Sequence, residues 1–104
     1  MRKDEIFDIY VKSVCDRYKV SATEQIFKKN KYKEVVEARF TLYYICYWRP
    51  MRVSSIQKFM GDNGYHISHS CILYGIAKMT DIIDKDEDYK KLILELESDA
   101  VHFI

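Results

Sequence analysis

A basic cluster and a polar segment carry most of the side chains that could do chemistry in this chain. Four lysines fall within six residues with no acid between them: Lys28, Lys29, Lys31 and Lys33. Such a cluster neutralises nucleic-acid phosphates, or it forms a solvated basic loop. Downstream, His69 and Ser70 carry groups that donate or accept hydrogen bonds at base edges. These residue types favour a polyanionic partner.

Catalysis has no support in the residue pattern. No nucleophile stands beside a base, no carboxylates pair at a defensible spacing, and no Gly-rich loop could hold a nucleotide. His66, His69 and Cys71 are metal-ligand types, but at most two of them can face the same way, and no fourth ligand is evident. We therefore expect a protein that is not an enzyme and has no metal, cofactor or nucleotide.

Cysteine usage and hydropathy favour a cytoplasmic protein. Cys15, Cys46 and Cys71 lie in apolar stretches and form no C-x-x-C motif, so we expect buried, reduced thiols. No apolar run reaches the roughly 20 residues of a membrane span. The charged first residues do not resemble a signal peptide. A membrane partner is therefore not expected.

Charge is divided along the chain, although the net charge is only +1. Residues 17–79 carry eleven Lys and Arg against four Asp and Glu, whereas residues 80–104 carry three against eight. A basic middle beside an acidic tail indicates one face suited to a polyanion. We expect residues 28–39, 52–58 and 66–70 to form one positive surface, with the acids of 81–99 mostly off it.

The elements that must position these residues are helical. A chain of 104 residues fits one domain, residues 1–104, and three glycines and one proline leave few breaks. Apolar spacing predicts a helix over 3–18 and a short helix from a Ser21–Glu24 capping box to Phe27. A basic loop and a buried central helix over 34–48, ended by Pro50, follow. The aromatic residues of that helix are expected in the core: Tyr43, Tyr44, Tyr47 and Trp48.

The second half of the chain predicts a helix-turn-helix. Ser54 or Ser55 can cap a short helix that ends at Gly61, and residues 62–64 form a turn. Ser68 can cap a longer helix that runs to an acidic break at 84–88, and a last helix continues to Phe103. A short helix, a turn and a longer helix in this order are typical of units whose second helix enters the major groove.

Four ordered segments resemble the C-terminal DNA-binding domain, domain IV, of the bacterial replication initiator DnaA. They are residues 14–20, 33–39 (Lys-Glu-Val-Val-Glu-Ala-Arg), 53–61 and 69–79 (His-Ser-Cys-Ile-Leu-Tyr-Gly-Ile-Ala-Lys-Met). The resemblance spans roughly residues 10–97. It implies an all-α, Trp-repressor-like bundle of about six helices, with a helix-turn-helix that binds double-stranded DNA.

The resemblance also implies roles for individual residues. Lys31 takes the place of an arginine that enters the minor groove, Arg39 that of a phosphate-binding arginine, and His69-Ser70 that of a base-reading pair. Without the resemblance, Arg39 would be expected to pair with Glu34 or Glu37. The expected DNA contacts are Lys28, Lys29, Lys31, Lys33, Arg39, Arg52, Ser54, His66, Ser68, His69 and Ser70.

The departures from the family concern DNA readout. Residues 62–68 separate Gly61 from His69, where the family has only about three residues. Ile67-Ser68 replace its Arg-Asp pair, and Phe40 and Ser54 replace a glutamine and a proline. The family's DNA sequence is therefore not expected here.

Two functions remain open at this point. One is a DNA-binding accessory protein of replication or transcription in a mobile element or phage. The other is a protein-interaction module that kept the fold but lost sequence-specific DNA readout. The lysine cluster favours the first function, and the altered residues of the turn favour the second.

Overall fold

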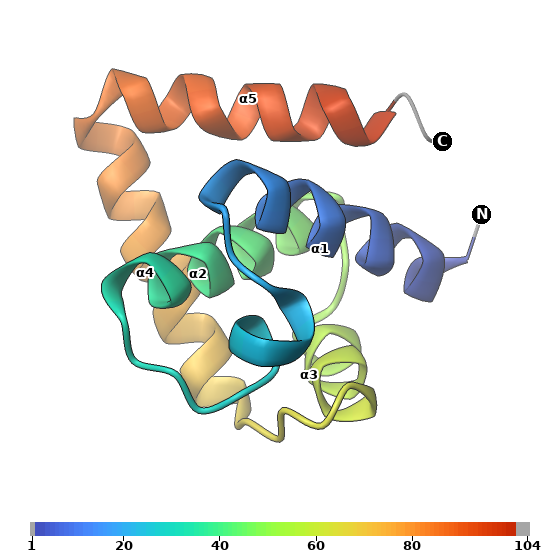
Figure 1. Cartoon of the computed structure of the whole chain (residues 1–104). Helices are drawn as coiled ribbons and strands as arrows, with labels where there is room; N and C mark the ends of the chain where they lie inside the picture. Colours follow the sequence, from blue (N-terminus) through green and yellow to red (C-terminus); the bar gives the residue numbers. More distant parts are fainter. Residues whose placement is uncertain (1, 102–104) are drawn as a thin grey trace.

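The computed structural model describes residues 2–101, and the side chains of residues 2–98. Within these residues every regular element is helical: α1 (Lys3–Tyr18), the π-helical turn η1 (Ala22–Ile26), α2 (Lys33–Trp48), α3 (Val53–Asp62), α4 (His69–Lys85) and α5 (Glu87–Val101) (Figure 1). The predicted all-α bundle of about six helices is confirmed. None of the helices described is long and apolar enough to cross a membrane.

α2 is the buried central helix, as predicted. Val35, Ala38, Leu42 and Ile45 form its buried stripe, and the helix packs against both α1 and α4. Burial of an aliphatic side chain stabilises the fold by about 1.5–3 kcal/mol. The core is therefore built around α2, the helix that directly follows the lysine cluster.

The aromatic cluster of α2 lies only partly in the core. Tyr43 is buried, whereas Tyr47 is 39% and Trp48 is 61% exposed. The prediction of a core position is wrong for these two residues. Because a helix has 3.6 residues per turn, Trp48 lies about one turn after Tyr44, at the end of α2. Its ring centroid is 6.2 Å from that of Tyr44 and 5.7 Å from that of Tyr47.

α2 and α4 cross closely at Gly75. A Cβ atom at this position would lie 2.7 Å from Phe40 Cδ1 and 3.0 Å from Tyr43 Cδ2. Carbon atoms in contact are normally about 3.5–4.0 Å apart. Glycine is therefore the residue that lets the aromatic side of α2 rest on the backbone of α4.

The turn η1 begins with a capping box that differs from the predicted one. Ser21 Oγ accepts a hydrogen bond from the Glu24 N–H at 3.2 Å, while the Ser21 N–H donates to Gln25 Oε1 at 2.7 Å. The box therefore closes on Gln25 rather than on Glu24. The turn is π-helical, because the Ile26 N–H donates to Ser21 O at 3.0 Å, five residues back. The extra residue in the turn places Gln25, rather than Glu24, where its side chain can accept from the Ser21 N–H.

The short helix and the longer helix predicted on either side of the turn are both present, and α3 begins earlier than predicted. α3 starts at Val53, before either serine predicted to cap it. Arg52, whose backbone is extended, is the N-cap residue instead. α4 starts with the predicted cap, in which Ser68 Oγ accepts from the Cys71 N–H at 3.2 Å. α3 runs one residue past the glycine predicted to end it, and the chain turns at Gly64, whose φ of +90° suits glycine.

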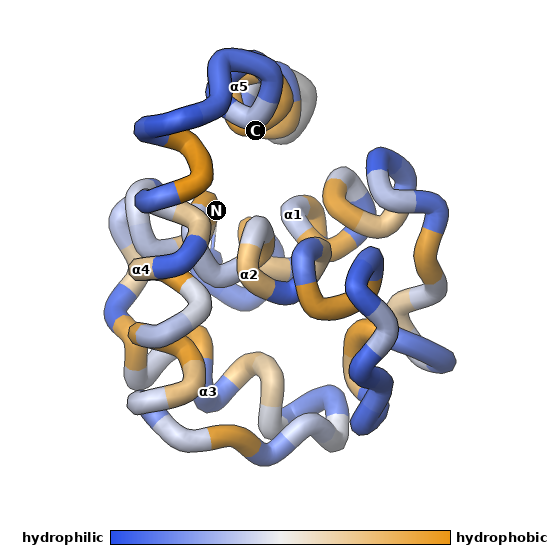
Figure 2. The backbone as a smooth tube through the Cα atoms, turned by 90° about the vertical axis from the view of Figure 1, so that its left-hand side faces the viewer, coloured by the Kyte–Doolittle hydropathy of each residue, from blue (hydrophilic) through white to orange (hydrophobic). Residues whose placement is uncertain are grey.

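α5 closes the bundle on the side away from the α3–α4 turn (Figures 1 and 2). Its own Ile93 and Leu96 are buried. Tyr89 Oη donates to Glu37 Oε2 at 2.9 Å, and burial, followed by this bond, raises the pKa of Tyr89 to about 12. The acidic break is confined to Asp86. Phe103, expected in the last helix, lies outside the described residues.

Candidate nucleic-acid interface

Arg39 is buried inside the protein, with 5% of its surface exposed. Its Nε donates to Ile26 O at 2.9 Å, Nη1 to Asn30 O at 2.8 Å, and Nη2 to Gln25 O at 2.9 Å and to Lys28 O. A guanidinium has five N–H donors, so few remain for an outside ligand. The prediction that Arg39 binds phosphate is corrected here, and so is the alternative of an ion pair with a neighbouring glutamate on α2.

These hydrogen bonds fix the course of the lysine loop, residues 28–32, which joins η1 to α2. Within the loop the Tyr32 N–H donates to Asn30 Oδ1 at 2.9 Å. All four lysines of the cluster are exposed, three in the loop and one at the start of α2. The backbone of the loop is therefore tied to α2, while its ammonium groups remain free to meet an anion.

The turn between α3 and α4, residues 63–68, is held at several points. The Tyr65 N–H donates to Met60 O at 2.9 Å, and Gln57 Nε2 donates to Ile67 O at 2.7 Å. The Arg39 guanidinium lies over the Tyr65 ring, 4.7 Å from its centroid, in a cation–π contact. Arg39 thus contacts both the lysine loop and the turn, and fixes one against the other.

A groove of about 410 Å³ separates the lysine loop from the turn, and its walls carry Lys28, Lys29, Tyr65 and His66. A second hollow of about 590 Å³ continues along α3 and is lined by residues that include Ser54, Lys58, His66 and Ser68. His66 and Ile67 line both. Five of the predicted contact residues, from three separate parts of the chain, are therefore brought to one side of the molecule.

The first turn of α4 extends this side. His69, Ser70 and Cys71 are all exposed. The prediction of three buried thiols holds for Cys46, whose pKa burial raises, and in part for Cys15, whose pKa burial raises to about 11. It is wrong for Cys71, because the first turn of α4 projects beyond the core that covers its later residues.

The other predicted contacts are exposed as well. Lys31 does not line the groove; it lies farther along the lysine loop, next to Tyr32. Arg52 is exposed at the beginning of α3, at the opposite end of that helix from the turn. Lys33 is exposed at the beginning of α2. Of the predicted set, Arg39 alone is buried.

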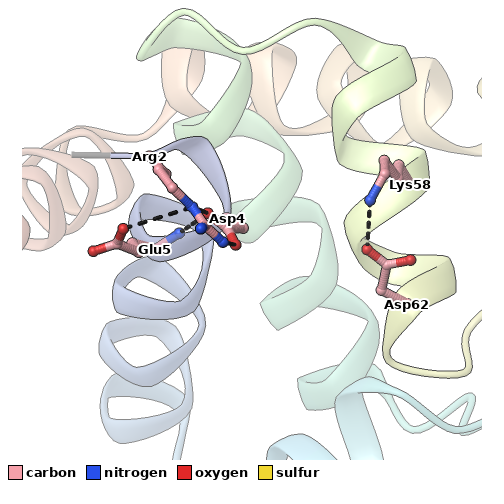
Figure 3. A network of polar contacts seen from close by, with 5 residues as sticks. All are labelled: Arg2, Asp4, Glu5, Lys58 and Asp62. Carbon is pink, nitrogen blue, oxygen red and sulfur yellow. Dashed lines mark hydrogen bonds and ion pairs between the residues drawn. The ribbon is translucent and has the colours of Figure 1, made fainter.

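Two acidic groups near this side are paired, and many of the others lie on α5. Glu24 and Glu34, which flank the lysine loop, are exposed without an ion pair among the described residues but are outnumbered by its four lysines. Lys58 Nζ is 2.9 Å from Asp62 Oδ2 on α3, and Arg2 pairs with Asp4 at the start of α1 (Figure 3). The hydrogen bond from Arg2 lowers the pKa of Asp4 to about 2. The acidic α5 lies across the opposite side of the bundle (Figures 1 and 2). The side that carries the lysine loop and the turn is therefore positive.

Three exposed apolar side chains on the lysine loop and α4 were not anticipated from the sequence. Tyr32 is 73% exposed between two lysines, and Leu73 and Tyr74 are 51% and 57% exposed on α4. The Tyr74 ring packs edge-on against Phe40, with centroids 6.0 Å apart. The Lys-Tyr-Lys triplet was a usable signal, since an aromatic residue inside a basic segment without apolar period has no core to enter.

Among the described residues, no group of three His, Cys, Asp or Glu side chains is arranged to hold a metal ion. Comparison of the chain with models of protein families, with curated proteins and with solved structures finds no match. The interpretation of this side of the molecule therefore rests on its own geometry and charge.

Proposed function

We propose that this protein binds double-stranded DNA, with the first turn of α4 in the major groove and the lysine loop on the adjacent backbone. The observation that carries the proposal is the common placement of the lysine loop, the α3–α4 turn and the polar start of α4, away from the acidic α5 (Figure 1). Clustered, unpaired cations supply the sequence-independent part of DNA affinity, and a polar helix start supplies base contacts.

We also propose that this domain is of the same type as domain IV of DnaA, and that the protein has an accessory role in replication or transcription. It is supported by the order short helix, turn, long helix in α3 and α4, and by the exposure of His69 and Ser70. The long turn of residues 63–68 and the burial of Arg39 differ from that family's pattern of contacts. We therefore propose DNA binding with a different balance of contacts and a different preferred sequence.

Salt dependence of binding to a random-sequence duplex tests the proposal. Among the predicted DNA contacts, five exposed cations have no ion-pair partner in the described part of the chain: Lys28, Lys29, Lys31, Lys33 and Arg52. If all five neutralise phosphates, log K falls with log salt with a slope of about −4 to −5. Fluorescence anisotropy between about 50 and 200 mM salt measures that slope. A slope near zero, or no binding at low salt, contradicts the proposal.

A protein-interaction module is the second candidate, and the exposed apolar side chains favour it. Leu73 and Tyr74 stand on the outer face of α4, and Trp48 is 61% exposed at the far end of α2. Tryptophan and tyrosine are enriched where proteins contact one another. Failure to bind any duplex at low salt, with the fold intact by circular dichroism, favours this candidate over DNA binding.

A further inference from the structure

His66 occupies the point where the two hollows of the positive side meet. On one wall of the groove are Lys28 and Lys29, from the lysine loop. On the other side, α3 contributes Lys58 and Asp62, whose charged atoms are 2.9 Å apart and largely offset one another. No ion pair joins either loop lysine to an acid within the described residues. The groove around His66 is therefore positive and accessible to an anion.

The position of His66 is fixed although its side chain is exposed. The residue before it, Tyr65, is held by its hydrogen bond to Met60 O and by the stacked Arg39. The carbonyl of the residue after it accepts the hydrogen bond from Gln57. A Cβ atom on Gly61 would be 3.3 Å from His66 Nδ1, so a glycine at this position lets the imidazole rest against α3. The ring thus faces the groove from a defined place.

The charge of the imidazole is coupled to what the groove contains. A protonated ring close to two lysine ammonium groups is repelled by them when the groove holds only water. A phosphodiester between the walls reverses the sign of the interaction, because every cation then faces an anion. Proton uptake by His66 and anion binding in the groove should therefore favour each other.

We propose that this groove seats one phosphodiester strand of the duplex, and that His66 adds a contact made only by its protonated ring. The inference rests on the proposed DNA-binding function and adds a defined backbone subsite and a pH dependence to it. Since the bound state takes up the proton more readily, affinity is highest below the titration range of histidine. Affinity then decreases as pH rises through that range.

The test is the salt slope of duplex binding at two pH values, about 5.5 and about 8. For the unaltered chain we expect the slope to steepen by about 0.9 at the lower pH, the effect of one more neutralised phosphate. Affinity at fixed salt should rise about three- to tenfold, as expected for uptake of up to one proton. His66→Gln should keep the slope of the higher pH at both values, while His66→Lys should give the steeper slope at both.

His69→Gln is the companion variant, because this histidine is exposed on the same side but lies in α4, outside the groove. Because the first turn of α4 is proposed to contact bases, only the difference in salt slope between the two pH values, measured on a random-sequence duplex, is compared. We expect it to preserve the pH dependence. A pH dependence that persists in His66→Gln, or that disappears in His69→Gln alone, overturns the proposal. Duplex binding whose slope is the same at both pH values refutes the role of His66 and leaves the proposed function standing. Absence of duplex binding at both pH values refutes both.

Discussion

Replacement of Arg39 tests whether this residue holds the interface together or contacts DNA itself. Its guanidinium donates to four carbonyls of η1 and the lysine loop and stacks on Tyr65. Methionine fills a similar volume but donates no hydrogen bond. A hydrogen bond to a charged group contributes about 1.5–3 kcal/mol, and an acceptor left unsatisfied in a buried site costs about 1–3 kcal/mol.

The magnitude follows from how many of these carbonyls water can reach after the change. Ile26 is fully buried, whereas Lys28 is exposed and Gln25 and Asn30 are half-buried. The Ile26 carbonyl thus stays unsatisfied, whereas those of Gln25 and Lys28 keep backbone N–H donors and that of Asn30 regains water. Together with a stacking contact of about 1 kcal/mol, the expected loss for Arg39→Met is about 3–5 kcal/mol, a large part of the 5–15 kcal/mol typical of a small domain.

Chemical denaturation followed by circular dichroism measures this loss. Arg39→Lys is the milder companion, because an ammonium group restores the charge but cannot reach four acceptors in a plane. We expect a loss of about 2–3 kcal/mol for this variant. Both variants should also weaken duplex binding, through a disordered lysine loop. If Arg39→Met unfolds within about 0.5 kcal/mol of the unaltered chain and flattens the salt slope by about one unit, then Arg39 contacts phosphate and our reasoning is wrong.

Two further predictions concern the helix crossing and the division of labour at the interface. Gly75→Ala should stabilise the fold by about 1 kcal/mol through helix propensity but destabilise it by about 2–3 kcal/mol through the clash with the rings of α2. The Tm should therefore fall, by roughly 4–8 °C for each kcal/mol of net destabilisation. An unchanged or higher Tm contradicts the close crossing. Lys29→Ala with Lys31→Ala should weaken binding to all duplexes alike and flatten the salt slope by up to about two units, whereas alanines on α5 in place of its exposed lysines should not. His69→Ala with Ser70→Ala should cost about 1–3 kcal/mol on the preferred duplex only, and an unchanged preferred motif in a random-library selection shows that this helix does not read bases.

The parts of the fold that the sequence predicted are those set by local signals. The spacing of apolar residues predicted α1 with the boundaries that the structure has. Pro50 and Ser68 marked the end of α2 and the beginning of α4, because a missing N–H and a capping hydroxyl act on adjacent backbone. The exposure of Trp48 could not be predicted in the same way, since the apolar residues of α2 extend round most of the helix, and which of them another helix covers at its end depends on tertiary packing.

The candidate site was predictable in its composition but not in its connections. The lysine cluster and the polar start of α4 were evident from residue types. The role of Arg39 was not, because its partners are backbone carbonyls nine to fourteen residues away, and carbonyls have no signature in a sequence. The groove at His66 also depends on how the long turn folds back, which is decided by contacts with Gln57 and Gly61 rather than by local preference.

The burial of Arg39 changes how affinity for a duplex would have to arise. A guanidinium on the surface adds one phosphate contact, and loses rotamer entropy when it binds. Inside the protein, the same group holds the lysine loop against the turn before any ligand arrives, so that ordering the loop costs less on binding. Apart from Arg52, the predicted contacts that remain as cations are lysines, which act as point charges with little directional preference. We therefore expect strong salt dependence and modest sequence preference, with discrimination left to the first turn of α4.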